Sequence, residues 1–224
     1  MSLKSFLKLF FLGEEILEKA HSPINGELLV YRDLFGRKIL RAGRVTQSGV
    51  LVDRLWKRGL KAIDNLEIKN CLILGLGGGT LAKLISKKYK KAKITGIEID
   101  SEIIKLGKKY FEIDKIKNLK IILDDAFQAT GKLSVNNFDL IFVDLYIGQE
   151  FPKKAEEKEF FDNLKKLITP NGAIIFNRLN FNKEHKKMTK EFEKKIRAFF
   201  PRVESLNVVY NRLFFAFLEP KNRV

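Results

Sequence analysis

A glycine-rich turn after a short apolar segment is the feature that most limits how this chain folds. The run Gly75-Leu76-Gly77-Gly78-Gly79 follows the apolar residues Cys71–Leu74 and precedes a segment with helical periodicity. Glycines at such a junction let the backbone turn tightly and approach a ligand that a Cβ atom would block. Glu98 ends the next apolar segment, where a carboxylate can accept hydrogen bonds from ribose hydroxyls. This pair predicts an adenosine-containing ligand at the carboxyl edge of an α/β sheet.

From residue 70 onward, strand-like and helix-like segments alternate, which is typical of an α/β sheet. The predicted strands are Cys71–Leu74, Lys93–Glu98, Leu119–Leu123, Phe138–Val143 and Ala173–Asn177. The predicted helices are Leu81–Tyr89, Glu102–Phe111, Glu156–Ile168 and Lys183–Phe200. Two extended runs, Arg202–Val209 and Arg212–Leu218, then flank a predicted hairpin turn at Tyr210-Asn211. We predict a Rossmann-like, mostly parallel sheet of the class I methyltransferase type that ends in an antiparallel hairpin.

The first part of the chain lacks this alternation. It predicts a helix at Ser2–Ala20, a β-hairpin formed by Glu27–Arg32 and Arg37–Ala42, and a helix at Leu51–Ile63. We therefore divide the chain into an N-terminal helix and β-hairpin region at residues 1–66 and a Rossmann-like adenosyl-cofactor-binding domain at residues 67–224.

Composition excludes several classes of protein. The net charge of +16 comes mainly from lysines spread over predicted helix faces, so we do not expect sequence-specific nucleic-acid binding. No apolar run is long enough to span a bilayer, and we expect no membrane association. The single cysteine, Cys71, favours a cytoplasmic protein without disulfides. His21 and His185 have no companion ligands, so we predict no metal site.

Acidic residues lie at the ends of three of the predicted strands, and Glu98 is the one that ends the second. Ligands of open α/β sheets bind at the carboxyl ends of the strands, so these carboxylates are candidates for the site. Asp124-Asp125-Ala126 follows the third strand, and Asp144 with Tyr146 follows the fourth. We expect Asp100 to be the N-cap of the helix that begins after it, and one of Asp124 and Asp125 to cap a short helix.

The motifs together resemble those of the spermidine synthase (polyamine aminopropyltransferase) family. The similar segments are Leu74–Gly79, Glu98–Asp100, Asp125–Phe127 and Phe138–Asp144, preceded by Phe35–Arg37 and Gly43–Ser48. The resemblance extends from about residue 28 to about residue 180, and its N-terminal motif separates this family from general methyltransferases. It implies that the adenosyl group is bound by Gln47, Gly75, Gly77, Gly78, Gly79, Glu98, Asp125, Ala126 and Asp144.

The positions that match the polyamine side of the family's site are different in this chain. Thr80 stands where the family has an acidic residue, and Ile147 stands where it has the aspartate that serves as general base. Trp56-Lys57 replaces a Tyr-Gln or Tyr-His pair, and we expect Lys57 to repel a diamine. A diamine needs carboxylates, and its attacking nitrogen must lose a proton to a base. We therefore expect that the polyamine site is lost.

Three functions are consistent with this pattern. The one we favour is a methyltransferase that uses S-adenosylmethionine and has lost the polyamine site, with Asp144 and Tyr146 as the polar groups near the reacting carbon. The second is a divergent aminopropyltransferase that uses decarboxylated S-adenosylmethionine, with Asp144 or Glu150 as base. The third is a non-catalytic adenosyl-binding module. The acceptor, a small molecule or a protein, is not identified, and a homodimer is among the oligomeric states that the sequence allows.

Overall fold

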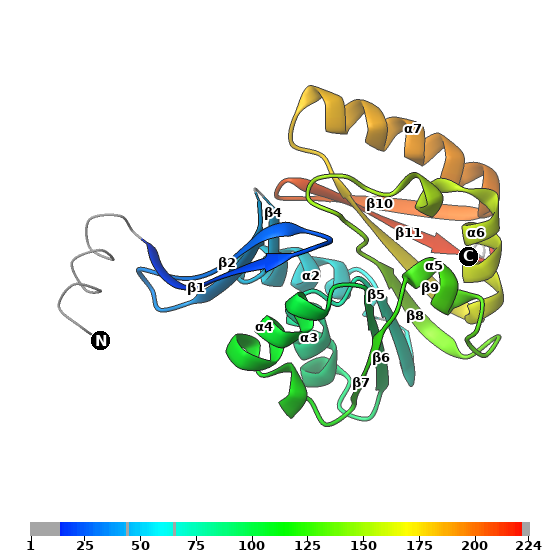
Figure 1. The fold of residues 1–224 in the computed structure, drawn as a ribbon. Helices are drawn as coiled ribbons and strands as arrows, with labels where there is room; N and C mark the ends of the chain where they lie inside the picture. The colour runs from blue at the N-terminus through cyan, green and yellow to red at the C-terminus, as the bar shows by residue number, and fades with distance from the viewer. Residues whose placement is uncertain (1–13, 44, 65, 221–224) are drawn as a thin grey trace.

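The protein is built on two β-sheets that lie end to end (Figure 1). The computed structural model describes residues 14–43, 45–64 and 66–220. A four-stranded antiparallel sheet contains the strands in the order β1-β2-β3-β4, and a seven-stranded sheet has the order β10-β11-β9-β8-β5-β6-β7. In Figure 1 the smaller sheet extends from one end of the larger one.

The larger sheet confirms the predicted fold class. Its strands β5 to β9 run parallel to one another, and β11 and β10 are added antiparallel. The strands are β5 (Asn70–Leu74), β6 (Lys93–Glu98), β7 (Leu119–Leu123), β8 (Phe138–Val143), β9 (Ile168–Leu179), β10 (Arg202–Val208) and β11 (Asn211–Phe217). From β5 the chain continues to β6 on one side, whereas β8 continues to β9 on the other. This reversal opens a crevice at the carboxyl ends of β5 and β8, where α/β proteins bind ligands.

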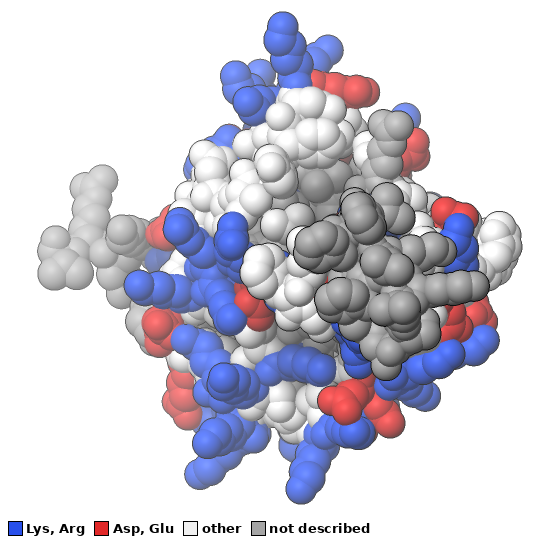
Figure 2. Space-filling model, turned by 90° about the vertical axis from the view of Figure 1, so that its left-hand side faces the viewer, with Lys and Arg blue, Asp and Glu red and all other residues white. Residues whose placement is uncertain are grey.

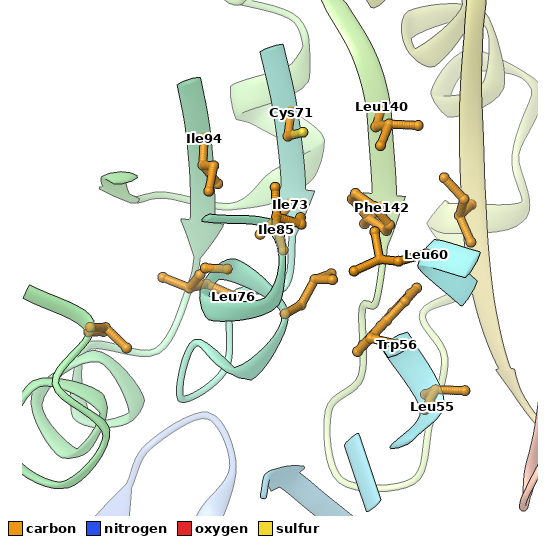
Figure 3. Close-up of a cluster of buried hydrophobic side chains, with 14 of the residues drawn as sticks. Leu55, Trp56, Leu60, Cys71, Ile73, Leu76, Ile85, Ile94, Leu140 and Phe142 are labelled. Atoms are coloured by element: carbon orange, nitrogen blue, oxygen red, sulfur yellow. The ribbon is translucent and has the colours of Figure 1, made fainter. Parts of the chain in front are cut away.

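Helices cover both faces of this sheet. The elements α2 (Val50–Lys61), α3 (Thr80–Lys88) and α4 (Ser101–Phe111) pack on one face, and α5 (Ala126–Thr130), α6 (Lys158–Leu167) and α7 (Lys183–Phe199) pack on the other. Two short 3-10 helices, Ile113–Lys115 and Lys153–Glu156, follow α4 and precede α6. Alternate residues of each strand point to opposite faces, so Ile73 joins one apolar cluster and Leu72 and Leu74 join the other. Figure 3 shows Trp56 of α2 beside Phe142 of β8, with their rings edge to face at 5.3 Å.

The N-terminal part differs from the sequence prediction. The hairpin is confirmed as β2 (Gly26–Asp33) and β3 (Lys38–Ala42), to which β4 (Val45–Ser48) is added. The predicted helix is wrong over residues 14–20, which form the strand β1 (Glu14–Ser22), and residues 2–13 of it lie outside the described residues. Glu, Leu, Lys and Ala favour a helix locally, but pairing with β2 and an ion pair between Glu18 and Lys109 of α4 at 2.6 Å override that preference.

Two smaller boundaries also differ. Val208 pairs with Asn211, so the hairpin turn consists of Val209 and Tyr210 rather than Tyr210-Asn211. Val209 has a φ of 54° in this turn, a backbone conformation that a β-branched residue rarely adopts. Strand β9 begins at Ile168, five residues before the predicted start at Ala173, because Phe138 of β8 pairs with Ile168 before the register shifts.

The carboxylate of Asp100 joins the two sheets. Asp100 caps α4 as predicted, because its Oδ1 accepts hydrogen bonds from the backbone nitrogens of Glu102 and Ile103. Its Oδ2 accepts hydrogen bonds from Ser22 Oγ at 2.5 Å and Asn25 Nδ2 at 2.7 Å, both at the β1–β2 turn. One apolar cluster contains side chains from both sheets, and the domain boundary near residue 66 stays a prediction.

On the face of the molecule that Figure 2 shows, which is the left-hand side of Figure 1, lysines and arginines predominate. They are spread among acidic and uncharged residues rather than gathered in one patch. This distribution agrees with the expectation that the protein does not read nucleic-acid sequence, which stays a prediction. Among the described residues, none of the helices is long and apolar enough to cross a membrane, and no cluster of three or more His, Cys, Asp or Glu side chains is arranged to hold a metal.

We predict that Asp100→Ala lowers the free energy of unfolding by about 1.5–3 kcal/mol, because the variant loses the helix cap and leaves Ser22 without its buried acceptor. Urea denaturation measures this change. Asp114→Ala, which removes an exposed carboxylate after the same helix, is the control and should change stability by less than about 0.5 kcal/mol. Equal stability of the two variants would contradict the linking role of Asp100.

Candidate active site

Two adjoining cavities open at the carboxyl ends of β5 and β8. We call the first the glycine-loop cavity; it is lined by residues of the β5–α3 turn, the ends of β6 and β8, and the segment after β7. The second cavity has a volume of about 380 Å³ and is bounded by α2, the end of β9 and the β10–β11 turn. Four residues line both cavities, and they are Gln47, Val52, Asp144 and Tyr146.

Two glycines of the loop form one wall of the first cavity. Gly75 has a φ of +88°, and a Cβ atom there would lie 2.2 Å from the carbonyl oxygen of Asp144, so only glycine fits between β5 and β8. Gly77 has a φ of +56°, and its Cβ would lie 2.9 Å from the carbonyl oxygen of Gln47. Gly78 and Gly79 do not line the cavity; they allow close packing against Ser48 and Ile113.

Glu98 lies beneath this loop and shapes it. The side chain is 6% exposed, and its Oε2 accepts a hydrogen bond from the backbone nitrogen of Gly77 at 2.8 Å. Its Oε1 accepts from the backbone nitrogens of Ile99 and Asp100. Burial raises the pKa of the Glu98 carboxyl, and these three donors oppose the shift. Glu98 therefore positions the loop as well as lining the cavity.

The acidic pair after β7 lines the opposite wall. Asp125 is the N-cap of α5 and accepts a hydrogen bond from the backbone nitrogen of Phe127 at 2.9 Å. Asp124 accepts from the backbone nitrogen of Asp125 and forms an ion pair with Lys132 at 3.3 Å. Both carboxylates and Ala126 line the glycine-loop cavity, so the expected cap and the predicted binding residues coincide.

Asp144 lies between the two cavities at the end of β8. Its Oδ2 accepts a hydrogen bond from Trp56 Nε1 at 3.3 Å, and its Oδ1 accepts from Asn177 Nδ2 at 2.7 Å. Asn177 in turn accepts from Asn211 Nδ2 at 2.9 Å. Removal from bulk water raises the pKa of Asp144 to about 6, although the two hydrogen bonds oppose the shift. The group can thus hold or release a proton near neutral pH.

Tyr146 has its hydroxyl bound to the backbone of β9. The hydroxyl donates to the carbonyl oxygen of Asn177 at 3.2 Å and accepts from the backbone nitrogen of Leu179 at 2.8 Å. Burial raises the pKa of this phenol, so it stays protonated at neutral pH. The side chain lines both cavities and fixes the segment after β8 against β9.

Sequence reasoning missed Asn25, Asn177 and the role of Trp56. Asn25 and Trp56 line the glycine-loop cavity, and Asn177 lines the second cavity. Asn177 could have been predicted from the sequence, because it is a polar residue at the end of an apolar strand, as Asp144 is.

Two buried atoms, Gln47 Nε2 and Asn25 Oδ1, have no hydrogen-bond partner within the described part of the chain. A donor and an acceptor left open at the cavity suit a ligand with hydroxyl groups and ring nitrogens.

Some of the residues that replace the family's polyamine-binding residues do not face the site. Thr80 and Ile147 line the glycine-loop cavity and do not line the second cavity. Lys57 does not line either cavity, and it forms an ion pair with Asp53 at 2.7 Å on the outer face of α2. The expectation that Lys57 repels an amine is therefore wrong, because the turn of the helix directs Trp56 inward and Lys57 outward.

Comparison with known proteins agrees with this geometry. A family model described as "Spermine/spermidine synthase domain" matches residues 59–214, which is more than half of the chain. The chain belongs to the spermine/spermidine synthase domain family. This assignment confirms the resemblance that the glycine loop, Glu98 and Asp144 suggested.

The chain is also similar to individual members of this family. It is 30% identical over 174 residues to a polyamine aminopropyltransferase of Prochlorococcus marinus strain MIT 9312, and the match covers 74% of this chain and 61% of that protein. The structure of a probable spermidine synthase from Corynebacterium glutamicum has a TM-score of 0.77 at 19% identity, covering 90% of this chain and 79% of that one.

Human methyltransferase-like protein 13, in complex with SAH, has a TM-score of 0.61 at 20% identity and covers 78% of this chain and 82% of that one. At this identity the likeness shows the fold alone. The comparisons therefore favour the aminopropyltransferase alternative and do not support the function that we favoured from the sequence, a methyltransferase with a lost polyamine site.

We predict that Glu98→Ala weakens binding of methylthioadenosine about tenfold or more, because a charged acceptor of ribose hydroxyls contributes about 1.5–3 kcal/mol. Calorimetry measures the affinity. Since Glu98 also holds Gly77, we expect the variant to lose thermal stability too. Glu102→Ala, in the first turn of α4 and outside both cavities, is the control and should bind normally. Unchanged affinity of Glu98→Ala would disprove this assignment.

The raised pKa of Asp144 predicts a pH dependence of stability. The folded protein holds this proton up to about pH 6, whereas the unfolded chain releases it near 3.8. The stabilisation is therefore fully present below pH 3.8 and is lost as the pH rises through about 6. Between pH 4 and 7, urea denaturation should show that the free energy of unfolding falls by about 1–3 kcal/mol, and Asp144→Asn should lack this fall. The same dependence of unfolding free energy on pH in both proteins would contradict the raised pKa of Asp144.

Proposed function

We propose that this protein transfers an aminopropyl group from decarboxylated S-adenosylmethionine to an amine. The observation that carries the proposal is the charge of the glycine-loop cavity. Four carboxylates line it, and they are Glu98, Asp124, Asp125 and Asp144. Among the described lining residues there is no Lys, Arg or His. Lys132 pairs with Asp124 but does not itself line the cavity.

This charge distribution favours one adenosyl donor over the other. Decarboxylated S-adenosylmethionine carries a sulfonium and an ammonium group and no carboxylate. S-adenosylmethionine carries an additional carboxylate, which in this cavity would meet other carboxylates and no basic side chain. Like charges in a poorly solvated cavity repel strongly. The cavity is therefore suited to a doubly cationic donor.

The remaining features suit the binding of the adenosyl part of the donor. Gln47 Nε2 and Asn25 Oδ1 offer one open donor and one open acceptor, and Glu98 supplies the carboxylate for ribose hydroxyls. Because Gly75 and Gly77 have no Cβ atom, the backbone of the loop itself forms part of the cavity wall. These groups fit an adenosine and hold it against the end of β5.

In the proposed reaction, the nitrogen of a neutral amine forms a bond to the aminopropyl carbon beside the sulfonium. The bond between that carbon and sulfur breaks, its electron pair stays on sulfur, and methylthioadenosine leaves. The new secondary ammonium then gives up one proton. Asp144 is the candidate base because it lines both cavities and its pKa is about 6. Glu150, the other candidate base, lines neither cavity.

We predict that decarboxylated S-adenosylmethionine binds at least about tenfold more tightly than S-adenosylmethionine at pH 8, a difference of about 1.4 kcal/mol. Calorimetry with both donors and methylthioadenosine tests this. Asp144→Asn removes one carboxylate with little change in shape and should narrow the difference in affinity between the two donors. Asp162→Asn, on the outer face of α6, is the control and should leave that difference in affinity unchanged.

Turnover provides the second measurement, as release of methylthioadenosine in the presence of a panel of primary amines. Tighter binding of S-adenosylmethionine together with methyl transfer would overturn the proposal in favour of a methyltransferase. Binding of the decarboxylated donor without any release of methylthioadenosine would instead favour a non-catalytic adenosyl-binding module.

A further inference from the structure

The second cavity has the position of an acceptor site. It shares Asp144 and Tyr146 with the glycine-loop cavity, so a ligand that fills it meets the Asp144 carboxylate where the two cavities adjoin. Asn177 orients this carboxylate from β9, and Trp56 orients it from α2. An ammonium or amine group is the complement of a carboxylate held in this way.

The charges of this cavity oppose a second cationic group. Asp144 is the only carboxylate among the described residues that line it, and Arg41 is a basic residue in its wall. The guanidinium of Arg41 donates to the hydroxyl of Tyr31 at 2.6 Å, lies 4.7 Å from the centre of that ring and forms an ion pair with Glu14 at 3.8 Å. A diamine would place its second ammonium in a cavity whose described lining has no second carboxylate, so the cost of removing that charge from water would not be offset by a partner.

Apolar side chains make up much of the remaining wall. They are Val45, Leu51, Val52, Leu55, Leu179, Phe181 and Val209. Of these, Leu51, Phe181 and Val209 are 43%, 44% and 50% exposed, and they come from α2, the segment after β9 and the β10–β11 turn. Tyr210, 59% exposed, adds an aromatic ring from the same turn. Apolar side chains that gather from three elements around one opening favour a ligand with an apolar body.

The backbone of the β10–β11 turn supports a ligand-binding role for these side chains. Val209 has a φ of 54°, which is strained for a β-branched residue. Two-residue hairpin turns of this kind ordinarily contain Asn, Asp or Gly. Strained residues are concentrated at binding and catalytic sites, and this one lines the second cavity. An apolar side chain is thus present where the local backbone favours Asn or Gly.

We propose that the second cavity binds a monoamine with an apolar body and no second cationic group. Its nitrogen is held at Asp144, and its apolar body extends along Leu51, Phe181 and Val209 toward the opening. This inference rests on the proposed function, since it names the acceptor for that reaction, but binding of the amine can be measured without turnover.

The test compares two probes of equal length on the full chain. The protein is saturated with methylthioadenosine, which fills the first cavity, and is titrated at pH 8 with n-hexylamine or 1,6-diaminohexane. We expect hexylamine to bind at least tenfold more tightly. In assays with the decarboxylated donor, hexylamine should also release methylthioadenosine with the larger kcat/KM. Equal or tighter binding of the diamine would overturn the inference.

Variants separate binding from folding. Val209→Asn removes the apolar side chain and relieves the backbone strain, so it should weaken hexylamine binding at least threefold while thermal stability is kept or raised. Val135→Asn is the matched control at an exposed valine outside both cavities, and it should bind hexylamine normally. Leu51→Glu adds a carboxylate to the wall and should shift the preference toward the diamine. If neither Val209→Asn nor Leu51→Glu changes amine binding, the site is elsewhere and the inference fails.

The outcomes also distinguish this inference from the proposed function. Tight binding of the decarboxylated donor with a preference for diamines would leave the proposed function standing and overturn the monoamine acceptor. Absence of donor binding with intact, selective binding of hexylamine would overturn the proposed function and leave the amine site standing. Donor binding without binding of either amine would contradict the acceptor site alone.

Discussion

The carboxylate of Asp144 stands where the two halves of the large sheet diverge, and the geometry of the site depends on how it is held. Trp56 and Asn177 donate to its two oxygens, and Asn211 extends this network to β11. Four separate parts of the fold are thereby fixed around one group, since α2, the residue after β8, β9 and β11 each contribute a member. The carbonyl of the same residue leaves no room for a side chain at Gly75. A hydrogen-bonded network of this kind is rigid when every member has a partner.

The N-terminal sheet completes the site. Gln47 lies in β4 and lines both cavities. Asn25 lies at the β1–β2 turn and lines the glycine-loop cavity. The same turn is tied to α4 through the buried carboxylate of Asp100. The glycine-loop cavity is therefore composite, with residues from both sheets in its wall. This explains why a family resemblance that began at the N-terminal motif was more specific than the glycine loop alone.

Much of the fold and part of the site could be predicted from local sequence. The glycine turn, Glu98 and Asp144 all follow directly from where apolar strands end, and parallel strands bring their ends to one edge. The N-terminal strand β1 could not be predicted in this way. Its residues favour a helix, and the pairing with β2 that decides the outcome is a tertiary contact. Asn177 was overlooked because its importance lies in the partner it finds across the sheet, which is Asp144.

From residue 70 onward the sequence by itself determined the order of the main strands and helices, the glycine loop and the carboxylates at the strand ends, because these depend on periodicity and on residues close in the chain. Only the tertiary structure decided which neighbours face the site. Trp56 is buried against Asp144, whereas the adjacent Lys57 points outward to Asp53. The balance of charge in each cavity is likewise a tertiary property. It depends on which distant side chains are brought together and removed from water, and Coulomb interactions are strong only there.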